Sequence, residues 1–149
     1  MRHKNIIIIF TVIIIALSAA LSVVAGITIN DNIQHKNSVL DAYTMSCKEA
    51  QESLYDFSNN GNETSYTYLT SHINAMIGIV QLADDDFSIN ELNNDLIICH
   101  TYLIEAPEES KMHIDLLNES LLLYLNDANT EGAHIRLKAF NNRVHQELN

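Results

Sequence analysis

Two cysteines and two histidines are the residues whose types best suit a metal-binding site. Cys47, His72, Cys99 and His113 each fall in a different predicted helix. Thiolate sulfur and imidazole nitrogen are the usual ligands of structural zinc, which takes four of them. If neighbouring helices run antiparallel, the rise of about 1.5 Å per residue brings all four residues to a similar height. The sequence is therefore compatible with a zinc site that takes one ligand from each of four helices. No two of these ligands have the short spacing in the chain that is typical of zinc sites. The alternative places the histidines at the rim of the bundle or hydrogen-bonded in its core.

The same cysteines offer a disulfide. Cys47 and Cys99 lie at nearly equal heights on helices that would point the same way, within about 3 Å along the bundle axis. A disulfide needs Cα atoms about 5.5 Å apart, and the first and third helices of a square four-helix bundle are diagonal and too distant. A compressed bundle would allow the bond. Otherwise both cysteines are small buried thiols.

The sequence contains no familiar catalytic motif. It has no glycine-rich phosphate loop, no Gly-x-Ser-x-Gly nucleophile elbow, no His-Glu-x-x-His and no Cys-x-x-Cys. The acidic run at 84–86 starts an incomplete calcium loop, because Ile89 occupies the glycine position and the bidentate glutamate is absent. We therefore expect no intrinsic catalysis and no cofactor, and a solvated turn at the acidic run.

The elements that must position these residues are helices. Apolar residues recur every three or four positions over about 38–58, 64–84, 88–103, 107–127 and 130–148. Gly61 suits the left-handed residue that ends the first helix, Ser88 begins a capping box for the third, and Pro107 suits the first position of the fourth. Short connections make successive helices antiparallel. The predicted fold is all-α, an up-and-down bundle of four to five helices.

Residues 121–125, Leu-Leu-Leu-Tyr-Leu, are apolar around the whole circumference of the fourth predicted helix. Such a segment is either buried between several helices or exposes a surface for a partner. Burial is our first expectation. In the second case Leu121, Leu122 and Leu125 would bind the partner.

The longest uncharged run, Ile6–Ile29, predicts a transmembrane helix. At about 1.5 Å per residue it spans roughly 36 Å, against about 30 Å of bilayer hydrocarbon. Arg2 and Lys4 precede it, so the positive-inside rule places residues 1–5 in the cytoplasm and residues 30–149 outside. Cleavage before Gly26 is the alternative, but the run exceeds the roughly 7–15 apolar residues of a signal peptide. We expect a retained single-pass anchor in the cell membrane.

Charge narrows the possible partners. All 19 acidic residues follow the apolar run, whereas only six of the eight basic residues do. So acidic a domain is not expected to bind nucleic acid. Five cytoplasmic residues are too few for an output domain. We therefore expect an extracytoplasmic helical module that binds another envelope protein or a second copy of itself. The alternatives are a small-ligand or metal-binding sensor-like domain, favoured by a polar cavity near His72 and Cys99, and a secreted domain released by signal cleavage.

Overall fold

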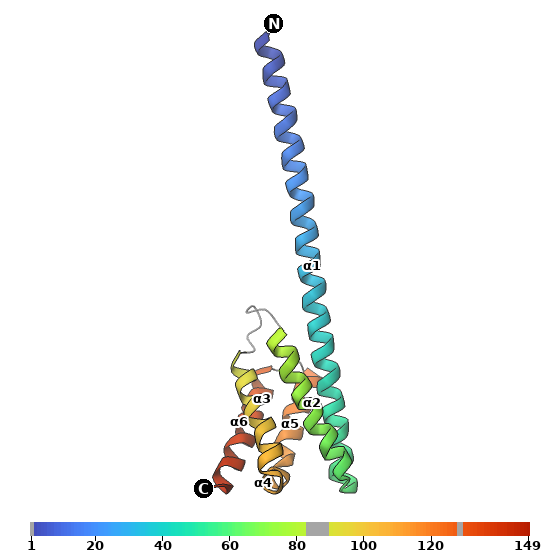
Figure 1. The fold of residues 1–149 in the computed structure, drawn as a ribbon, viewed down its shortest axis with the longest axis vertical. Helices are drawn as coiled ribbons and strands as arrows, with labels where there is room; N and C mark the ends of the chain where they lie inside the picture. The colour runs from blue at the N-terminus through green and yellow to red at the C-terminus, as the bar shows by residue number, and fades with distance from the viewer. Residues whose placement is uncertain (1, 83–89, 128–129) are drawn as a thin grey trace. The chain divides into compact units, whose positions relative to one another are not determined.

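The structure, a computed structural model, confirms the prediction of an all-α fold. It describes the backbone of residues 2–82, 90–127 and 130–149, and the side chains of residues 28, 30–81, 93–126 and 131–149. Within these ranges the chain is helical and has no strand. The helices are α1 (Arg2–Asn60), α2 (Glu63–Leu82), α3 (Asn90–Glu105), α4 (Pro107–Met112), α5 (Ile114–Asp127) and α6 (Thr130–Glu147) (Figure 1).

The chain divides into two units. The first, Met1–Ser38, contains the first part of α1, and the second, Val39–Asn149, contains the rest of α1 and the other five helices. In the part of the chain that the structure describes, no helix is long and apolar enough to cross a membrane. The predicted anchor Ile6–Ile29 lies outside the residues with described side chains, except for Thr28. The anchor therefore stays a prediction.

In the second unit the long helices follow one another around a shared core. α1 packs against α2, where the rings of Phe57 and Tyr66 are 5.1 Å apart, and against α5, where Tyr43 and Tyr124 are 5.0 Å apart. α2 packs against α3, α3 against α6, and α6 against α5. The helix contacts thus close in the order α1, α2, α3, α6, α5, a helical bundle as predicted (Figure 1).

One pair of neighbours in this bundle runs parallel. Asp95 near the start of α3 contacts His134 near the start of α6, and Tyr102 lies 3.2 Å from His145, about two turns further along α3 and about three turns further along α6. Sequence reasoning expected successive helices to be antiparallel neighbours and parallel helices, such as the first and third, to be diagonal. α6 instead meets α3 after the intervening α4 and α5, so the two helices point the same way.

The predicted fourth helix is two helices, α4 and α5, which corrects the expected number of helices. His113 separates them, and its backbone N–H donates to the carbonyl of Ser110 at 3.2 Å, closing a three-residue turn instead of an α-helical one. Pro107 occupies the first turn of α4, as predicted. The break lets the short α4 contact α3 and α6 while α5 packs along α6.

The predicted apolar stripes form the core. Each of the long helices contributes fully buried side chains that recur at helical spacing. The largest of them are Cys47, Leu54, Leu69, Ile73, Met76, Leu96, Cys99, Leu103, Leu117, Leu137, Phe140 and Val144. Helical periodicity in the sequence therefore identified most of each buried face, but Leu40 and Leu148, which end two of the predicted stripes, are 48% exposed.

The turn between α1 and α2 has the predicted glycine geometry. Gly61 has a φ of 61°, and its N–H donates to the carbonyl of Phe57 at 2.8 Å. Asn62 then caps α2, because its side-chain oxygen accepts from the N–H of Thr64 at 3.0 Å. The acidic run at 84–86 and Ser88 of the predicted capping box lie outside the described residues.

Candidate functional site

The two cysteines are fully buried free thiols. The Cys47 thiol faces α5 and lies 3.8 Å from the carbonyl oxygen of Leu121, to which it donates, whereas Cys99 lies on α3. Burial raises the pKa of Cys47 to about 12 and raises the pKa of Cys99 well above its ordinary value. The structure therefore contains two buried free thiols, the alternative that the sequence analysis gave beside the disulfide.

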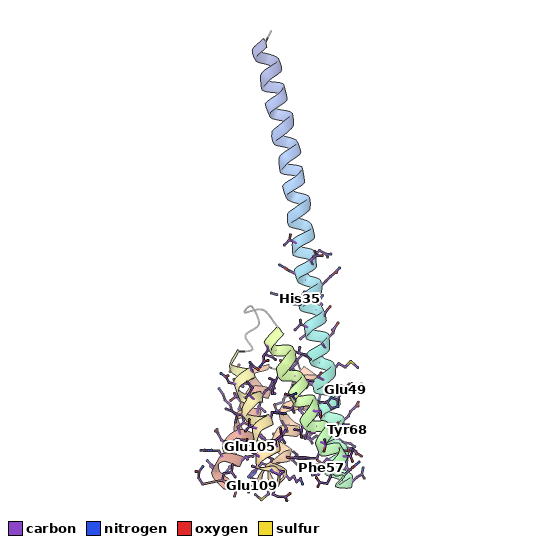
Figure 2. All side chains as sticks on the ribbon, in the orientation of Figure 1. His35, Glu49, Phe57, Tyr68, Glu105 and Glu109 are labelled. Atoms are coloured by element: carbon purple, nitrogen blue, oxygen red, sulfur yellow. The ribbon has the colours of Figure 1, made fainter. Side chains whose placement is uncertain are left out.

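The histidines of the predicted zinc site have other neighbours. Nδ1 of His72 lies 3.2 Å from a carboxylate oxygen of Glu49, and Nε2 of His113 lies 3.4 Å from one of Glu147. Figure 2 labels Glu49 on α1. Within the described part of the chain, no group of three or more histidine, cysteine, aspartate or glutamate side chains could hold a metal ion. The structure thus does not gather the four predicted ligands into one site.

The leucine-rich segment divides between core and surface. Leu121 is 3% exposed and belongs to the core, and Leu125 is partly buried against that core. Leu122 and Leu123 line an open groove between α5 and α6. Of the three leucines predicted to bind a partner, Leu122 therefore lines this groove, together with Leu123, which the sequence interpretation did not single out.

The α5–α6 groove combines an apolar floor with a polar rim. Its volume is about 390 Å³, and its lining is completed by Glu119, Asn126 and Arg136. The guanidinium Nε of Arg136 lies 3.0 Å from a carboxylate oxygen of Glu119, and both side chains are about half exposed. An apolar centre with hydrogen-bonding groups at its edge is the usual composition of a protein-binding surface. The groove can accept an apolar side chain and a few polar contacts.

A second groove lies between α2 and α3. It has a volume of about 440 Å³, and both helices line it at spacings of three and four residues. The lining residues are Tyr66, Thr67, Thr70, Ser71 and Asn74 on α2, His100, Leu103 and Ile104 on α3, and Pro107 on α4. Sequence reasoning gave a polar cavity around His72 and Cys99 as the mark of ligand binding. Neither residue lines this groove, although His100, the chain neighbour of Cys99, does. The neutral polar stripe on α2 was the signal for this groove in the sequence.

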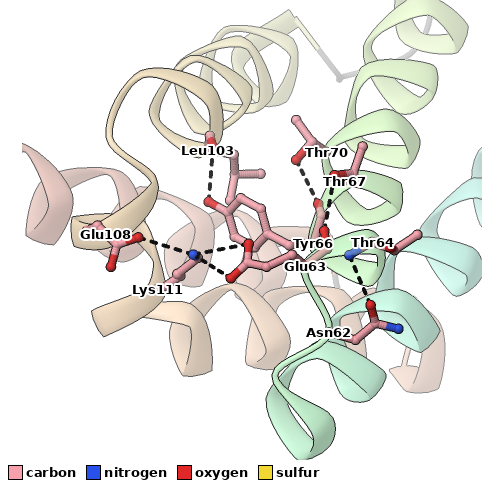
Figure 3. A network of polar contacts seen from close by, with 9 residues as sticks. All are labelled: Asn62, Glu63, Thr64, Tyr66, Thr67, Thr70, Leu103, Glu108 and Lys111. Carbon is pink, nitrogen blue, oxygen red and sulfur yellow. Dashed lines mark hydrogen bonds and ion pairs between the residues drawn. The ribbon is translucent and has the colours of Figure 1, made fainter.

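A polar network holds one end of this second groove (Figure 3). The phenol of Tyr66 donates to the carbonyl of Leu103 at 3.0 Å, joining α2 to α3. The ammonium of Lys111 on α4 lies 3.0 Å from Glu63 and 3.2 Å from Glu108, and 5.1 Å from the centre of the Tyr66 ring. The hydrogen bonds that Lys111 donates to Glu63 and then to Glu108 raise the pKa of Lys111. These contacts fix the position of Tyr66 in the groove wall.

A partly buried polar cluster joins α3 to α6. The Nε2–H of His134 donates to the carboxylate of Asp95, and the two side chains are 18% and 13% exposed. The ammonium of Lys138 lies 3.9 Å from the same carboxylate, and the side-chain amide of Asn141 donates to the Asp95 carbonyl at 2.9 Å. Sequence reasoning missed this cluster, because His134, Lys138 and Asn141 follow Asp95 by 39 or more positions in the chain and no local motif connects them. The contacts fix the register of α3 on α6, which is a structural role.

Comparison with known protein families, with curated proteins and with solved structures gives no match for this chain. Its function must therefore be inferred from the residues and from the two grooves.

Proposed function

We propose that this chain is a single-pass membrane protein whose extracytoplasmic helical bundle binds another envelope protein. The proposed anchor is Ile6–Ile29, with the N-terminus in the cytoplasm. Support for the anchor comes from 24 consecutive uncharged residues preceded by Arg2 and Lys4. The observation that supports binding is the α5–α6 groove, in which Leu122 and Leu123 meet a polar rim.

The groove favours a partner that inserts an apolar side chain. Interface centres that exclude water contribute most of the binding free energy, and the surrounding polar groups contribute mainly specificity. Glu119 and Arg136 form an ion pair at the rim and Asn126 adds an amide. A partner that places a leucine, phenylalanine or tryptophan over Leu122 and Leu123 can bond to these rim groups.

Charge favours a basic partner. The chain has a formal net charge of −11, and all of its acidic residues follow the proposed anchor. A field of one sign accelerates association with partners of the opposite sign. We therefore propose that the partner surface has a positive net charge around its apolar anchor residue. Raising the salt concentration would then lower the association rate more than it raises the dissociation rate.

Binding is tested by adding a charge to the groove floor. Leu122→Glu and Leu123→Glu place a carboxylate where the partner's apolar side chain would sit. The matched control is Ile135→Glu, because Ile135 is 59% exposed on α6 and does not line the groove. The full chain is purified from membranes of the source cells, and its fold is checked by circular dichroism. A partner that co-purifies with the wild type and the control should be lost from both groove variants. Equal recovery with all four proteins would reject the groove as the binding surface.

The proposed topology has a separate test. Tyr55 is 65% exposed on α1, so Tyr55→Cys provides an accessible thiol while Cys47 and Cys99 remain buried. A membrane-impermeant maleimide should label this variant in intact cells. Labelling that requires permeabilised cells would contradict an extracytoplasmic bundle. An intact mass that includes residues 1–29 would distinguish the retained anchor from the alternative of a released domain.

A small-ligand-binding domain is the second candidate function. The α2–α3 groove favours it, because its volume falls in the range of small-molecule sites and its lining mixes polar and apolar groups.

A further inference from the structure

We infer that the α2–α3 groove binds a small organic ammonium ion that carries an apolar group. This inference does not depend on partner binding at the α5–α6 groove, which lies between different helices. It rests on the direction of three hydroxyl groups, on the apolar wall that faces them, and on the charges around the groove.

The α2 wall presents hydrogen-bond acceptors. The hydroxyls of Thr67, Thr70 and Ser71 donate their hydrogens to the carbonyls one turn earlier on the same helix, at 2.9–3.1 Å. A hydroxyl has a single hydrogen, so a hydroxyl that donates to the backbone can only accept from a further partner. The three hydroxyl oxygens are therefore acceptors for a ligand, and a ligand that binds them must supply N–H or O–H donors.

The α3 wall adds an imidazole and apolar surface. Burial lowers the pKa of His100, so its ring is neutral near pH 7 and can accept a hydrogen bond through one nitrogen. Leu103, Ile104 and Pro107 line the rest of this wall, and Ile104 is 58% exposed. An apolar substituent packed here would remove that exposed surface from water. The groove thus separates a donor-binding wall from an apolar wall.

The surrounding charge selects a cation. Among the residues that the structure describes, no lysine, arginine, aspartate or glutamate lines the groove. Carboxylates stand around its end, on Glu63 at the start of α2, Glu105 at the end of α3 and Glu108 on α4, and Figure 2 labels Glu105. Lys111 is the basic group described near this end, and it contacts two of these three carboxylates. The local charge is therefore negative, which favours an ammonium donor over a neutral one and excludes a carboxylate ligand.

The test compares three probes that share one apolar group. They are 2-phenylethylammonium, the neutral 2-phenylethanol and the anion phenylacetate, each titrated into the ¹⁵N-labelled full chain in uncharged detergent micelles. We expect the ammonium to shift the amide signals of Thr70, Ser71 and His100, with the alcohol bound about tenfold more weakly because it loses a hydrogen bond with a charged donor. Phenylacetate should cause no shift in these signals.

Variants distinguish the groove from partition into the micelle. Thr70→Val removes one acceptor at nearly constant volume, and Ser71→Ala removes the next. Thr101→Val is the matched control, because the Thr101 hydroxyl makes the same backbone hydrogen bond, to Ile97, and does not line the groove. Weaker ammonium binding to both groove variants, with unchanged binding to the control, is the expected result. Equal shifts from all three probes, equal binding to all variants, or no shift at millimolar ammonium would each overturn the proposal.

Discussion

His134 on α6 donates a hydrogen bond to the carboxylate of Asp95 on α3, and the two side chains are 18% and 13% exposed. This pair connects the two parallel helices of the bundle, which are distant in sequence. A hydrogen-bonded polar pair with little solvent around it stabilises a fold only while both partners are present, because removing one leaves the other partly buried without a hydrogen-bond partner.

The Asp95–His134 pair should therefore show strong coupling in a double-mutant cycle. We expect Asp95→Ala and His134→Ala each to lower the free energy of unfolding by about 1–3 kcal/mol, the cost of leaving a partly buried polar partner unsatisfied. The double variant should lose less than the sum of the two. Urea denaturation of the full chain in micelles measures all four proteins.

The Glu119–Arg136 pair is the control for this cycle. Its atoms are 3.0 Å apart, but its side chains are 50% and 48% exposed. We expect a coupling below about 1 kcal/mol, as for other solvent-exposed ion pairs. A larger coupling for this exposed pair than for Asp95–His134 would contradict the structural role assigned to the partly buried cluster.

Two glycines should respond in opposite directions to alanine. Gly61 has a φ of 61°, and a side chain there meets no atom within 4 Å, so the cost of Gly61→Ala is conformational, about 1 kcal/mol. Gly78 lies inside α2 and also has open space around its position. Gly78→Ala should stabilise the protein by up to about 1 kcal/mol through helix propensity. Thermal melting measures the change in melting temperature of each variant. Equal changes in melting temperature for the two variants would contradict the left-handed conformation of Gly61.

The two thiols should be protected until the bundle unfolds. Cys47 and Cys99 have no exposed surface, and burial raises both pKa values, so little thiolate forms near pH 8. We expect iodoacetamide to modify neither cysteine in the native chain and both in concentrated urea. Mass spectrometry of the labelled protein measures this. A native mass with no label that also lacks two hydrogens would reveal the disulfide predicted from the sequence.

His100 should make stability depend on pH. Burial lowers its pKa below the ordinary value of 6.5. As the pH falls, His100 is protonated in the unfolded chain before it is protonated in the folded chain. The free energy of unfolding therefore decreases between about pH 7 and the pKa of His100 in the folded chain. Below that pKa the loss of stability is complete. We expect His100→Gln to lose less stability than the wild type between about pH 7.5 and pH 5.

Carboxylates provide the control for the pH experiment. Hydrogen bonds from Ser65 and Asn60 lower the pKa of Asp56 from 3.8, so its contribution is lost at more acidic pH. That loss is common to the wild type and the His100 variant. Identical urea midpoints for the two proteins at every pH would show that His100 is not held neutral by the fold.

The helices and their buried faces could be predicted from the sequence because both follow from local periodicity. Leu69, Ile73 and Met76 lie in the core as their spacing requires. Gly61 ends α1 for the same kind of reason, since the left-handed conformation favours glycine. The break at His113 could not be predicted, because neither glycine nor proline marks it and the contacts of α4 with α3 and α6 accompany it.

The candidate sites were less predictable, because they depend on which helices become neighbours. The zinc hypothesis placed four residues at one height but did not establish their directions, and His72 and His113 contact glutamates. The Asp95–His134 pair required the parallel α3–α6 contact, which no connection length indicates. Leu121 and Leu122 are adjacent in sequence, yet one lies in the core and the other lines the groove between α5 and α6.

Photo-crosslinking from the α5–α6 groove tests the central proposal most directly. A photoreactive amino acid replaces Leu122 in the full chain in the membranes of the source cells, and a second variant carries it at Leu148, which is 48% exposed outside the groove. We predict a crosslink from position 122 to one other envelope protein, abolished by Leu123→Glu, and no such product from position 148. Crosslinks from both positions alike, or from neither, would contradict the proposal that the groove binds a partner.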